Sequence, residues 1–308
     1  MKKVLSKKNI LVLGGTGFIG YHILKKAKKL KWNLTSISKK YPKKKRFIKG
    51  VNYILLDVSK KKALEKRIRD KFDYVINLIG ESENAVLQKN KKKILQKYYF
   101  NLKNLINFFS KREIDKFLHI GSSAEYGAIK PPHNEIVKCK PISDYGKSKL
   151  KATKYLLKKS KKNKFPAIIV RLFQVYGPNQ NKNIISVLIG NCKKNLKFNL
   201  THGNQTRDFC FIDDVVEAIF LLLNSKSKKV IGKIFNIGSG KSHSIKHVAK
   251  LVKNQIKKGV PVFGKLKFKK EEILHSEASI KKIYNALGWK PKYNLNKGIL
   301  KTISINEK

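Results

Sequence analysis

Cysteine is scarce in this sequence, and the few cysteines argue against two kinds of stabilising site. The 308 residues contain three cysteines, which lie far apart and lack the close spacing of metal ligands: Cys139, Cys192 and Cys210. An odd number of distant cysteines does not predict the disulfide framework of a small secreted domain. We therefore expect reduced thiols, as in a cytoplasmic protein, and no metal site.

Long apolar runs are also missing. The most apolar stretch, Ala218–Leu223, is far shorter than the roughly 18 residues that a membrane-spanning helix needs. The N-terminal residues MKKVLSKKN lead into a strand-like run without the apolar segment of a secretory signal peptide. These absences predict no signal peptide, no membrane partner and a cytoplasmic location.

Acidic residues and arginine are scarce, whereas lysine is abundant. Asp and Glu number 19 against 71 Lys and Arg, which gives a formal net charge of +52. Six of the 71 basic residues are arginine, so the remaining 65 are lysines, and they spread along the whole chain. Nucleic-acid sites concentrate arginine and aromatic residues in one patch, because guanidinium groups fork onto phosphates and stack on bases. We expect solvated lysines and no specific nucleic-acid partner.

What the sequence does contain is a regular alternation of short apolar runs with helical stretches. A helix is predicted over Phe18–Leu30, after the first of six predicted strands: Asn9–Leu13, Leu34–Ile37, Tyr53–Leu56, Tyr74–Ile79, Phe117–Ile120 and Ala167–Leu172. Short buried strands separated by helices are typical of an α/β fold with a Rossmann-type doubly wound parallel sheet. We expect this domain to span residues 1–175, and a smaller C-terminal substrate-binding region to span residues 176–308.

The stretch GGTGFIG follows the first predicted strand and opens the first predicted helix. Its glycines allow a tight turn and a close approach of the backbone to a pyrophosphate, which then lies at the helix N-terminus. This strand–turn–helix context predicts a dinucleotide site, in contrast to a glycine-rich turn without a ligand. The candidate cofactor-binding residues are Gly14, Gly17, Phe18, Ile19 and Gly20.

The ends of the second and third strands bear on which dinucleotide binds. A cofactor with a free ribose 2′-hydroxyl usually meets a carboxylate after the second strand. Here the stretch Ser36–Lys40 has no acid, and Ser38 with Lys39 or Lys40 could hold a 2′-phosphate instead. We therefore expect NAD(P) with a slight preference for NADP. Asp57 and Val58, after the third strand, are candidates to face the adenine, although a helix N-cap explains Asp57 equally well.

A tyrosine four residues before a lysine, Tyr145 and Lys149, forms a possible acid/base pair, because a nearby cation favours the phenolate. The spacing alone decides nothing, since seven of the 12 tyrosines have lysine at this position. Tyr145 is distinguished by the loop GSSAEYG, which follows a predicted strand and carries Ser122. Ser122, Tyr145 and Lys149 together predict a carbonyl/alcohol site beside a nicotinamide.

At this point the sequence resembles the extended short-chain dehydrogenases, the NAD-dependent epimerase/dehydratase family that acts on nucleotide sugars. The resemblance rests on GGTGFIG, GSSAEYG and YGKSK, followed in order by RLFQVYGP, GNQTRDFCFIDD, FNIGSG and LGWKP. It implies an NAD(P)-dependent enzyme with a nucleotide-diphosphate sugar as substrate, and a possible homodimer. The same resemblance implies that Arg207 grips the substrate diphosphate, where a guanidinium fork suits phosphate.

The sequence departs from the family pattern at two substrate positions. Gln174 stands where the family usually has asparagine, and Lys269 where it usually has arginine, so a bidentate grip is not expected there. The related 4,6-dehydratases carry acids just after the residue matching Ser122. Here Ser123 and Ala124 follow, and we expect the carboxylate of Glu125 to point away from the site.

Two C4 chemistries and one non-catalytic role remain open. A 4-keto-6-deoxyhexose reductase is narrowly favoured, because the NADP preference fits it and the stretch from Phe263 to Ile299 resembles CDP-sugar 4-keto reductases of the family. The alternative is a 4-epimerase that resembles UDP-glucose 4-epimerases. A remote alternative is a non-catalytic NADP-sensing scaffold on the same fold.

Overall fold

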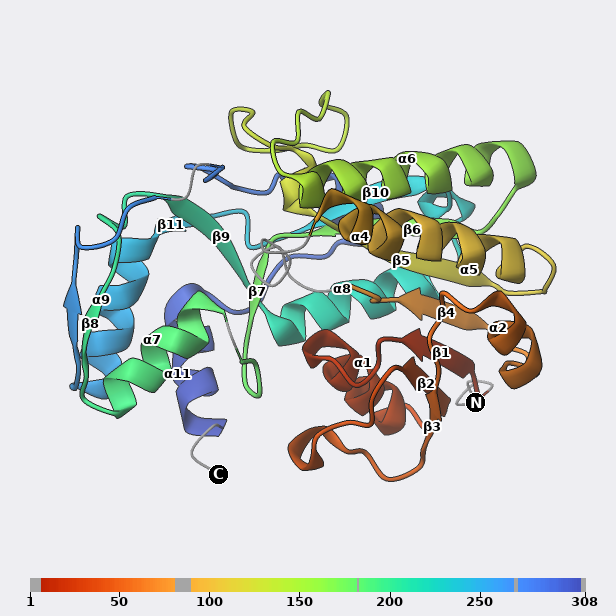
Figure 1. Cartoon of the computed structure of the whole chain (residues 1–308), viewed down its shortest axis with the longest axis horizontal. Coiled ribbons are helices and arrows are strands. Elements are labelled where there is room, and N and C mark those ends of the chain that lie inside the picture. The colour runs from red at the N-terminus through yellow and green to blue at the C-terminus, as the bar shows by residue number, and fades with distance from the viewer. Residues whose placement is uncertain (1–6, 81–89, 182, 269–270, 306–308) are drawn as a thin grey trace. The chain divides into compact units, whose positions relative to one another are not determined.

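The computed structural model describes residues 7–80, 90–181, 183–268 and 271–305 (Figure 1). Its largest sheet has seven strands in the order β10-β6-β5-β4-β1-β2-β3. These strands are β1 Asn9–Leu13, β2 Asn33–Ser38, β3 Val51–Leu55, β4 Tyr74–Asn77, β5 Lys116–Ser122, β6 Ala167–Leu172 and β10 Lys233–Ile237. Two smaller sheets have the orders β11-β9-β7 and β12-β8. Their strands are β7 Gln174–Tyr176, β8 Lys197–Asn199, β9 Thr206–Phe211, β11 Ser242–Ser244 and β12 Val260–Val262.

The helices follow the expected alternation with the strands. They are α1 Phe18–Lys29, α2 Lys61–Arg67, α4 Lys91–Leu95, α5 Asn101–Phe109, α6 Asp144–Asn163, α7 Ile184–Lys193, α8 Ile212–Asn224, α9 Ile245–Ile256, α10 Lys281–Leu287 and α11 Leu295–Ile305. Short turns of other helix types are η1 Lys44–Arg46, η2 Gln96–Phe100, η3 Ser123–Glu125 and η4 Lys228–Val230. No helix in the described ranges is both long and apolar enough to span a membrane.

The predicted α/β fold of Rossmann type is confirmed. The strands β1 and β6 have the predicted bounds, and the other predicted strands differ by one or two residues at their ends. β4 ends at Asn77 instead of Ile79, because the Asn77 side chain accepts a hydrogen bond from the Ile79 N–H at 3.1 Å and turns the chain. Such a side-chain bond offers the backbone an alternative to the strand ladder.

The arrangement around β1 determines where a ligand can bind. β1 pairs in parallel with β2 on one side and with β4 on the other. The chain therefore changes direction in the sheet between β1 and β4. Open α/β sheets bind ligands outside the carboxyl ends of the strands at such a switch point. The glycine loop after β1 and Ser122 at the end of β5 both lie at this carboxyl edge.

Helix α6 lies alongside α5, and the two are drawn in green and gold in Figure 1. Both share an apolar core with β1, β4 and β5, which includes Leu105 of α5, Leu156 of α6 and Phe117 of β5. The buried positions of α6 include Tyr145, Lys149, Ala152, Leu156 and Ser160, and they recur every three or four residues. This spacing places Tyr145 and Lys149 on the stripe of the helix that faces the interior.

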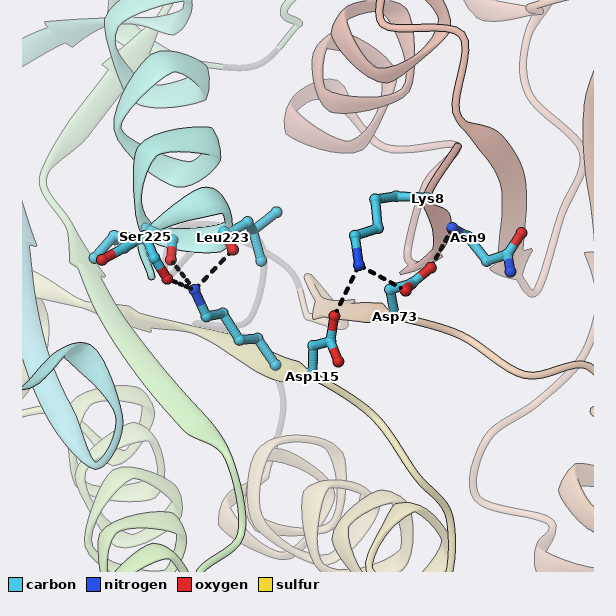
Figure 2. A network of polar contacts seen from close by, with 8 residues as sticks. Lys8, Asn9, Asp73, Asp115, Leu223 and Ser225 are labelled. Atoms are coloured by element: carbon cyan, nitrogen blue, oxygen red, sulfur yellow. Dashed lines mark hydrogen bonds and ion pairs between the residues drawn. The ribbon is translucent and has the colours of Figure 1, made fainter. Parts of the chain in front are cut away.

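The opposite, amino edge of the sheet is held by charged groups (Figure 2). Lys8 forms ion pairs with Asp73 at 2.9 Å and Asp115 at 3.0 Å, and it thereby joins the residues that precede β1, β4 and β5. Hydrogen bonds to Asp73 and Asp115 raise the pKa of Lys8. Lys116 donates to the carbonyl oxygens of Leu222, Leu223 and Ser225. A lysine at this place satisfies carbonyl groups that the end of α8 leaves without helical partners.

The chain divides into two compact units that alternate along the sequence. Unit 1 comprises residues 1–125, 144–170 and 219–234, and unit 2 comprises residues 126–143, 171–218 and 235–308. The expected division had a single boundary after residue 175, whereas each of these units is built from three separate segments of the chain. The assignment of cofactor binding to one part and substrate binding to the other stays a prediction.

Candidate active site

The glycine loop forms a tight turn between β1 and α1. The Gly14 N–H donates to the Ile37 carbonyl oxygen at 2.7 Å, and the Gly17 N–H donates to the Gly14 carbonyl oxygen at 3.0 Å. A Cβ on Gly20 would lie 2.6 Å from the Gly14 oxygen and the Gly15 Cα, so packing of the helix onto the loop requires glycine there. This close packing is the one expected of the last glycine in a dinucleotide loop.

Gly17 has a different reason to be glycine. It is exposed, has an ordinary φ of −73°, and a Cβ there would meet only the Gly14 oxygen, at 3.2 Å. Gly17 is also the N-cap of α1, which has no side-chain cap and no acid in its first turn. The helix N-terminus beside it, with half-buried Phe18 and Ile19, therefore presents backbone N–H groups that suit an anion. The loop fits a dinucleotide pyrophosphate.

The residues expected at the ribose and adenine lie together at the ends of β2 and β3. Ser38 Oγ accepts a hydrogen bond from the Thr16 N–H at 3.4 Å, which connects β2 to the glycine loop. Lys39 forms an ion pair with Asp57 at 2.7 Å. Burial favours a higher pKa for Asp57, but hydrogen bonds from Lys39 and Ser59 outweigh it and lower the pKa. The Lys39 charge is therefore already paired with a carboxylate.

The structure gives Asp57 a local role and limits how Val58 can contact a ligand. Asp57 is not the N-cap of the next helix, because α2 begins at Lys61 and its N-cap is Lys60. Asp57 instead accepts a hydrogen bond from the Ser59 N–H at 3.0 Å and forms a local turn. The Val58 side chain is 4% exposed and belongs to the apolar core, so only its backbone can face a ligand.

Ser122 ends β5 and is held by the turn that follows it. Ser122 Oγ accepts from the Ala124 N–H at 3.2 Å, and the Ser122 N–H donates to Glu125 Oε1 at 2.9 Å. Glu125 is fully buried. Its carboxylate binds the backbone N–H of Ser122, because the tight turn η3 folds it back. The expectation that it points away from the reacting sugar stays a prediction. Glu125 is thus part of the scaffold that orients Ser122.

Lys149 is buried next to the same strand. Its side chain is 5% exposed, and its Nζ donates to the Ile120 carbonyl oxygen at 2.8 Å, two residues before Ser122. Burial lowers the pKa of Lys149 to about 8, and the charge of Glu125 opposes this shift. A lysine with this pKa changes its charge near neutral pH, which suits a residue that tunes a neighbouring acid or base.

Tyr145 lies one turn before Lys149 on α6 and packs against the loop that carries Ser122. It forms an apolar cluster with Ile94, Tyr98 and Ala124, and the Lys149 Nζ lies 6.0 Å from the centroid of its ring. The structure therefore places Ser122, Tyr145 and Lys149 near the carboxyl end of β5, and their joint role in catalysis stays a prediction. Tyr98 and Glu125 were not among the predicted site residues, although Glu125 belongs to the stretch GSSAEYG.

In unit 2, Arg207 lies on β9 and Gln174 lies on β7. Gln174 pairs in register with Phe209, two residues after Arg207, so Gln174 and Arg207 share one face of this sheet. Arg207 forms an ion pair with Glu272, 65 residues away, and not with the adjacent Asp208. Asp208 is buried and accepts from the backbone N–H groups of Ser239, Gly240 and Ala278. Lys269 lies outside the described residues.

Within the described ranges there is no group of three or more His, Cys, Asp or Glu side chains that could hold a metal ion.

Comparisons with known proteins agree with this geometry. The sequence profile of the NAD dependent epimerase/dehydratase family matches residues 10–238. The chain is 29% identical to the putative UDP-glucose 4-epimerase of Methanocaldococcus jannaschii, over 96% of this chain and 97% of that protein. It is 33% identical to CDP-abequose synthase of Salmonella typhimurium, over 42% of this chain and 45% of that protein. A UDP-glucuronic acid 4-epimerase from Bacillus cereus, solved with UDP-glucuronic acid and NAD, has 25% identity and a TM-score of 0.87, over 97% of this chain and 98% of that chain.

Proposed function

The chain belongs to the NAD-dependent epimerase/dehydratase family, and from this premise we propose that it moves a hydride at C4 of a nucleotide-linked hexose. The observation that carries the proposal is the assembly of Ser122, Tyr145 and Lys149 around the end of β5. Tyr145 and Lys149 are buried there, and Lys149 is fixed by its bond to the Ile120 carbonyl. A solvated surface pair would not need this arrangement.

The residues divide the chemistry between them as follows. Bound NAD(P) supplies the acceptor or donor of the hydride. Tyr145 takes the proton of the C4 hydroxyl when the ketone forms, and it returns a proton when an alcohol forms again. The Lys149 ammonium favours the phenolate of Tyr145. The Ser122 hydroxyl donates a hydrogen bond to the same sugar oxygen and holds it in line with Tyr145.

The first candidate reaction is reduction of a nucleotide-linked 4-keto-6-deoxyhexose. It is supported by the likeness to CDP-abequose synthase, which at 33% identity spans 42% of this chain. It is also supported by the lack of an acid after β2, where Ser38 would contact a 2′-phosphate and NADP would be the cofactor.

The second candidate is 4-epimerisation, and one structural observation favours it. Lys39 is paired with Asp57 at 2.7 Å, so a 2′-phosphate would have to compete with a carboxylate for this lysine. NAD carries no such phosphate, and an epimerase keeps the same cofactor through both hydride steps. One relative that matches 96% of this chain is a putative UDP-glucose 4-epimerase, and the Bacillus cereus 4-epimerase was solved with NAD.

We further propose that the nucleotide diphosphate is held by Arg207, with Gln174 on the same face and Lys269 as a second cation. Arg207 is a planar donor that suits phosphate oxygens. Arg207 is already paired with Glu272, so this carboxylate competes with a phosphate for the guanidinium group. Both side chains are about one-fifth exposed. Changing Glu272→Gln should therefore lower the KM for the sugar nucleotide several-fold, whereas Glu271→Gln should leave it unchanged.

Two parallel assays decide between the candidate reactions. In one, a CDP- or dTDP-linked 4-keto-6-deoxyhexose is supplied with NADPH, and the absorbance of NADPH is followed. In the other, UDP-glucose is supplied to the protein loaded with NAD, and UDP-galactose is measured. Oxidation of NADPH establishes the reductase, and interconversion without net oxidation establishes the epimerase. Failure of both, across a panel of nucleotide sugars, would contradict hydride transfer at C4.

The cofactor loop can be tested separately from turnover. Gly17→Val places a branched side chain where the pyrophosphate is expected, and it should weaken NAD(P) binding by roughly tenfold or more, the loss expected from about 1.4 kcal/mol. Gly190→Val is a matched control, because a Cβ there meets nothing within 4 Å. Titration calorimetry measures both affinities. Equal affinities for Gly17→Val and the unchanged chain would show that this loop does not bind the cofactor.

A further inference from the structure

Tyr98 lies in a short π-helical turn between two α-helices. The turn η2, Gln96–Phe100, follows α4 directly and leads directly into α5. Single π turns within α-helices are rare and are frequent at functional sites, because the extra residue re-aims a side chain. Here the turn directs the Tyr98 ring into unit 1, where the residue is only 3% exposed.

The Tyr98 ring contacts both members of the acid/base pair. The Lys149 Nζ lies 5.0 Å from the centroid of the Tyr98 ring, which is closer than the 6.0 Å that separates it from the Tyr145 ring. The two tyrosine rings meet edge to face, with centroids 5.2 Å apart and an interplanar angle of 89°. The Lys149 ammonium therefore lies against two aromatic rings, and Tyr98 provides the nearer one.

The surrounding chain leaves room for this ring and little else. A Cβ on Gly80 would lie 2.6 Å from Tyr98 Cε1, so glycine three residues after β4 is needed for the ring to occupy its position. Ile94 and Ala124 complete the apolar cluster around Tyr98 and Tyr145. The ring is thus fixed by packing from several elements.

Besides the two tyrosine rings, Lys149 faces one carboxylate and one histidine. The described groups that face it are Tyr98 from η2, Tyr145 from α6, Glu125 from η3 and His119 from β5. His119 is buried, and burial together with Lys149 keeps its pKa well below its ordinary value, so it is neutral. The Glu125 carboxylate already accepts a hydrogen bond from the Ser122 N–H. A ring face carries partial negative charge and stabilises a cation within about 6 Å, most strongly where water is excluded.

We infer that Tyr98 is a positioning residue whose ring keeps Lys149 cationic and directed at Tyr145. This inference rests on the proposed function, in which Tyr145 moves the proton. The ring opposes the desolvation that burial imposes on the ammonium. Loss of its π face should therefore lower the pKa of Lys149 by roughly half a unit to one unit. A lysine that is neutral more of the time favours the Tyr145 phenolate less, so the phenolate forms at higher pH.

The test compares three changes at position 98. Tyr98→Phe keeps the ring and removes the hydroxyl, Tyr98→Leu removes the ring, and Tyr98→fluorinated phenylalanine keeps the shape but removes the negative face. Each is made with and without Tyr145→Phe, and the ultraviolet absorbance of the phenolate is titrated with pH in the full chain with its copurified cofactor. The difference between each pair isolates the titration of Tyr145.

In the Tyr98→Phe variant, Tyr145 should titrate at the same pH as in the unchanged chain. In the leucine and fluorinated variants, the midpoint of the Tyr145 titration should be roughly half a pH unit to one pH unit higher. If the leucine variant does not fold, the fluorinated variant still decides, because its shape is preserved. Equal midpoints for the phenylalanine and fluorinated variants would overturn the inference. The titration needs no turnover, so an inactive protein with the expected shift would refute the proposed function and leave the inference standing. Turnover without the shift would leave the proposed function standing and overturn the inference about Tyr98.

Discussion

Two tyrosine–lysine pairs on helix α6 have the same spacing and nearly the same geometry but different surroundings. The Lys149 Nζ lies 6.0 Å from the Tyr145 ring, and the Lys159 Nζ lies 5.9 Å from the Tyr155 ring. Lys149 and Tyr145 are buried, whereas Lys159 and Tyr155 are half-buried at the side of the interior stripe. The spacing in sequence determines the distance between the ammonium group and the ring, but it does not determine what surrounds the pair.

The difference lies in what each pair contacts. Burial lowers the pKa of Lys149 to about 8, near the pH at which a proton must move. Burial, helped by Tyr99, raises the pKa of Tyr155, so its phenol keeps the proton. The Tyr155 ring packs against the Tyr99 ring, with the ring centroids 5.7 Å apart. We therefore propose the first pair as the acid/base site and read the second as a packing contact.

The largest effect should come from removing the reactive hydroxyl. Tyr145→Phe should lower turnover by roughly 100-fold or more, the usual scale for a general acid/base, because no other described group replaces its proton. Turnover is measured with the nucleotide sugar that gives activity.

Tyr155→Phe is the matched control on the same helix, and it should change turnover less than about twofold, since its hydroxyl moves no proton. Similar losses from both substitutions would mean that the distinction between the pairs is misplaced.

The next effect concerns the cations. Lys149→Met removes the ammonium that favours the Tyr145 phenolate and should lower kcat by roughly tenfold or more, whereas Lys159→Met should have little effect. The loss should appear in kcat more than in KM, because Lys149 acts through Tyr145. A loss confined to KM would instead place Lys149 in substrate binding.

The smallest effect is one on stability, and its sign is opposite to that on activity. The pKa of Lys149 falls from 10.5 to about 8 on folding, so the unfolded chain holds a proton that the folded chain releases between these values. Stability therefore rises with pH in this window, and below about pH 8 the full cost of the buried ammonium is present. Lys149→Met should raise the free energy of unfolding at pH 7 by about 1–2 kcal/mol.

Urea unfolding at several pH values measures this effect. The advantage of Lys149→Met should shrink as the pH rises from 8 toward 10.5. Lys159→Met should show no comparable change with pH. An advantage that stays constant over this range would mean that it comes from packing and not from the charge.

The sequence predicts the fold well because each signal is local. The run NILVL predicts β1 with correct bounds, and GGTGFIG predicts the turn that follows. Parallel strands joined by helices then limit the topologies that the sheet can adopt. The trio of Ser122, Tyr145 and Lys149 was predicted for a similar reason, since each member belongs to a motif at a strand end or helix start.

The ion pairs of the site could not be predicted in this way. With 65 lysines among 71 basic residues, composition cannot indicate that Lys39 is the one that pairs with Asp57. Arg207 meets Glu272 across 65 residues of sequence, and no local pattern records that contact. Tyr98 owes its place to a π turn, which has no sequence signal that we recognise. Such contacts depend on tertiary packing, and they are the parts of the site most open to test.

The central claim is that this chain transfers hydride at C4 of a nucleotide-linked hexose, with Tyr145 moving the proton. The most direct test is to incubate the protein and oxidised NAD(P) with nucleotide-linked hexoses and 6-deoxyhexoses that carry deuterium at C4. Samples are quenched rapidly, before an epimerase can return the deuterium to C4, and mass spectrometry measures deuterium in the reduced cofactor. The account predicts labelled cofactor from at least one of these sugars with the unchanged chain and with Tyr155→Phe, and at least roughly 100-fold slower labelling with Tyr145→Phe. Unlabelled cofactor with every sugar, or equal labelling by the Tyr145→Phe protein, would contradict it.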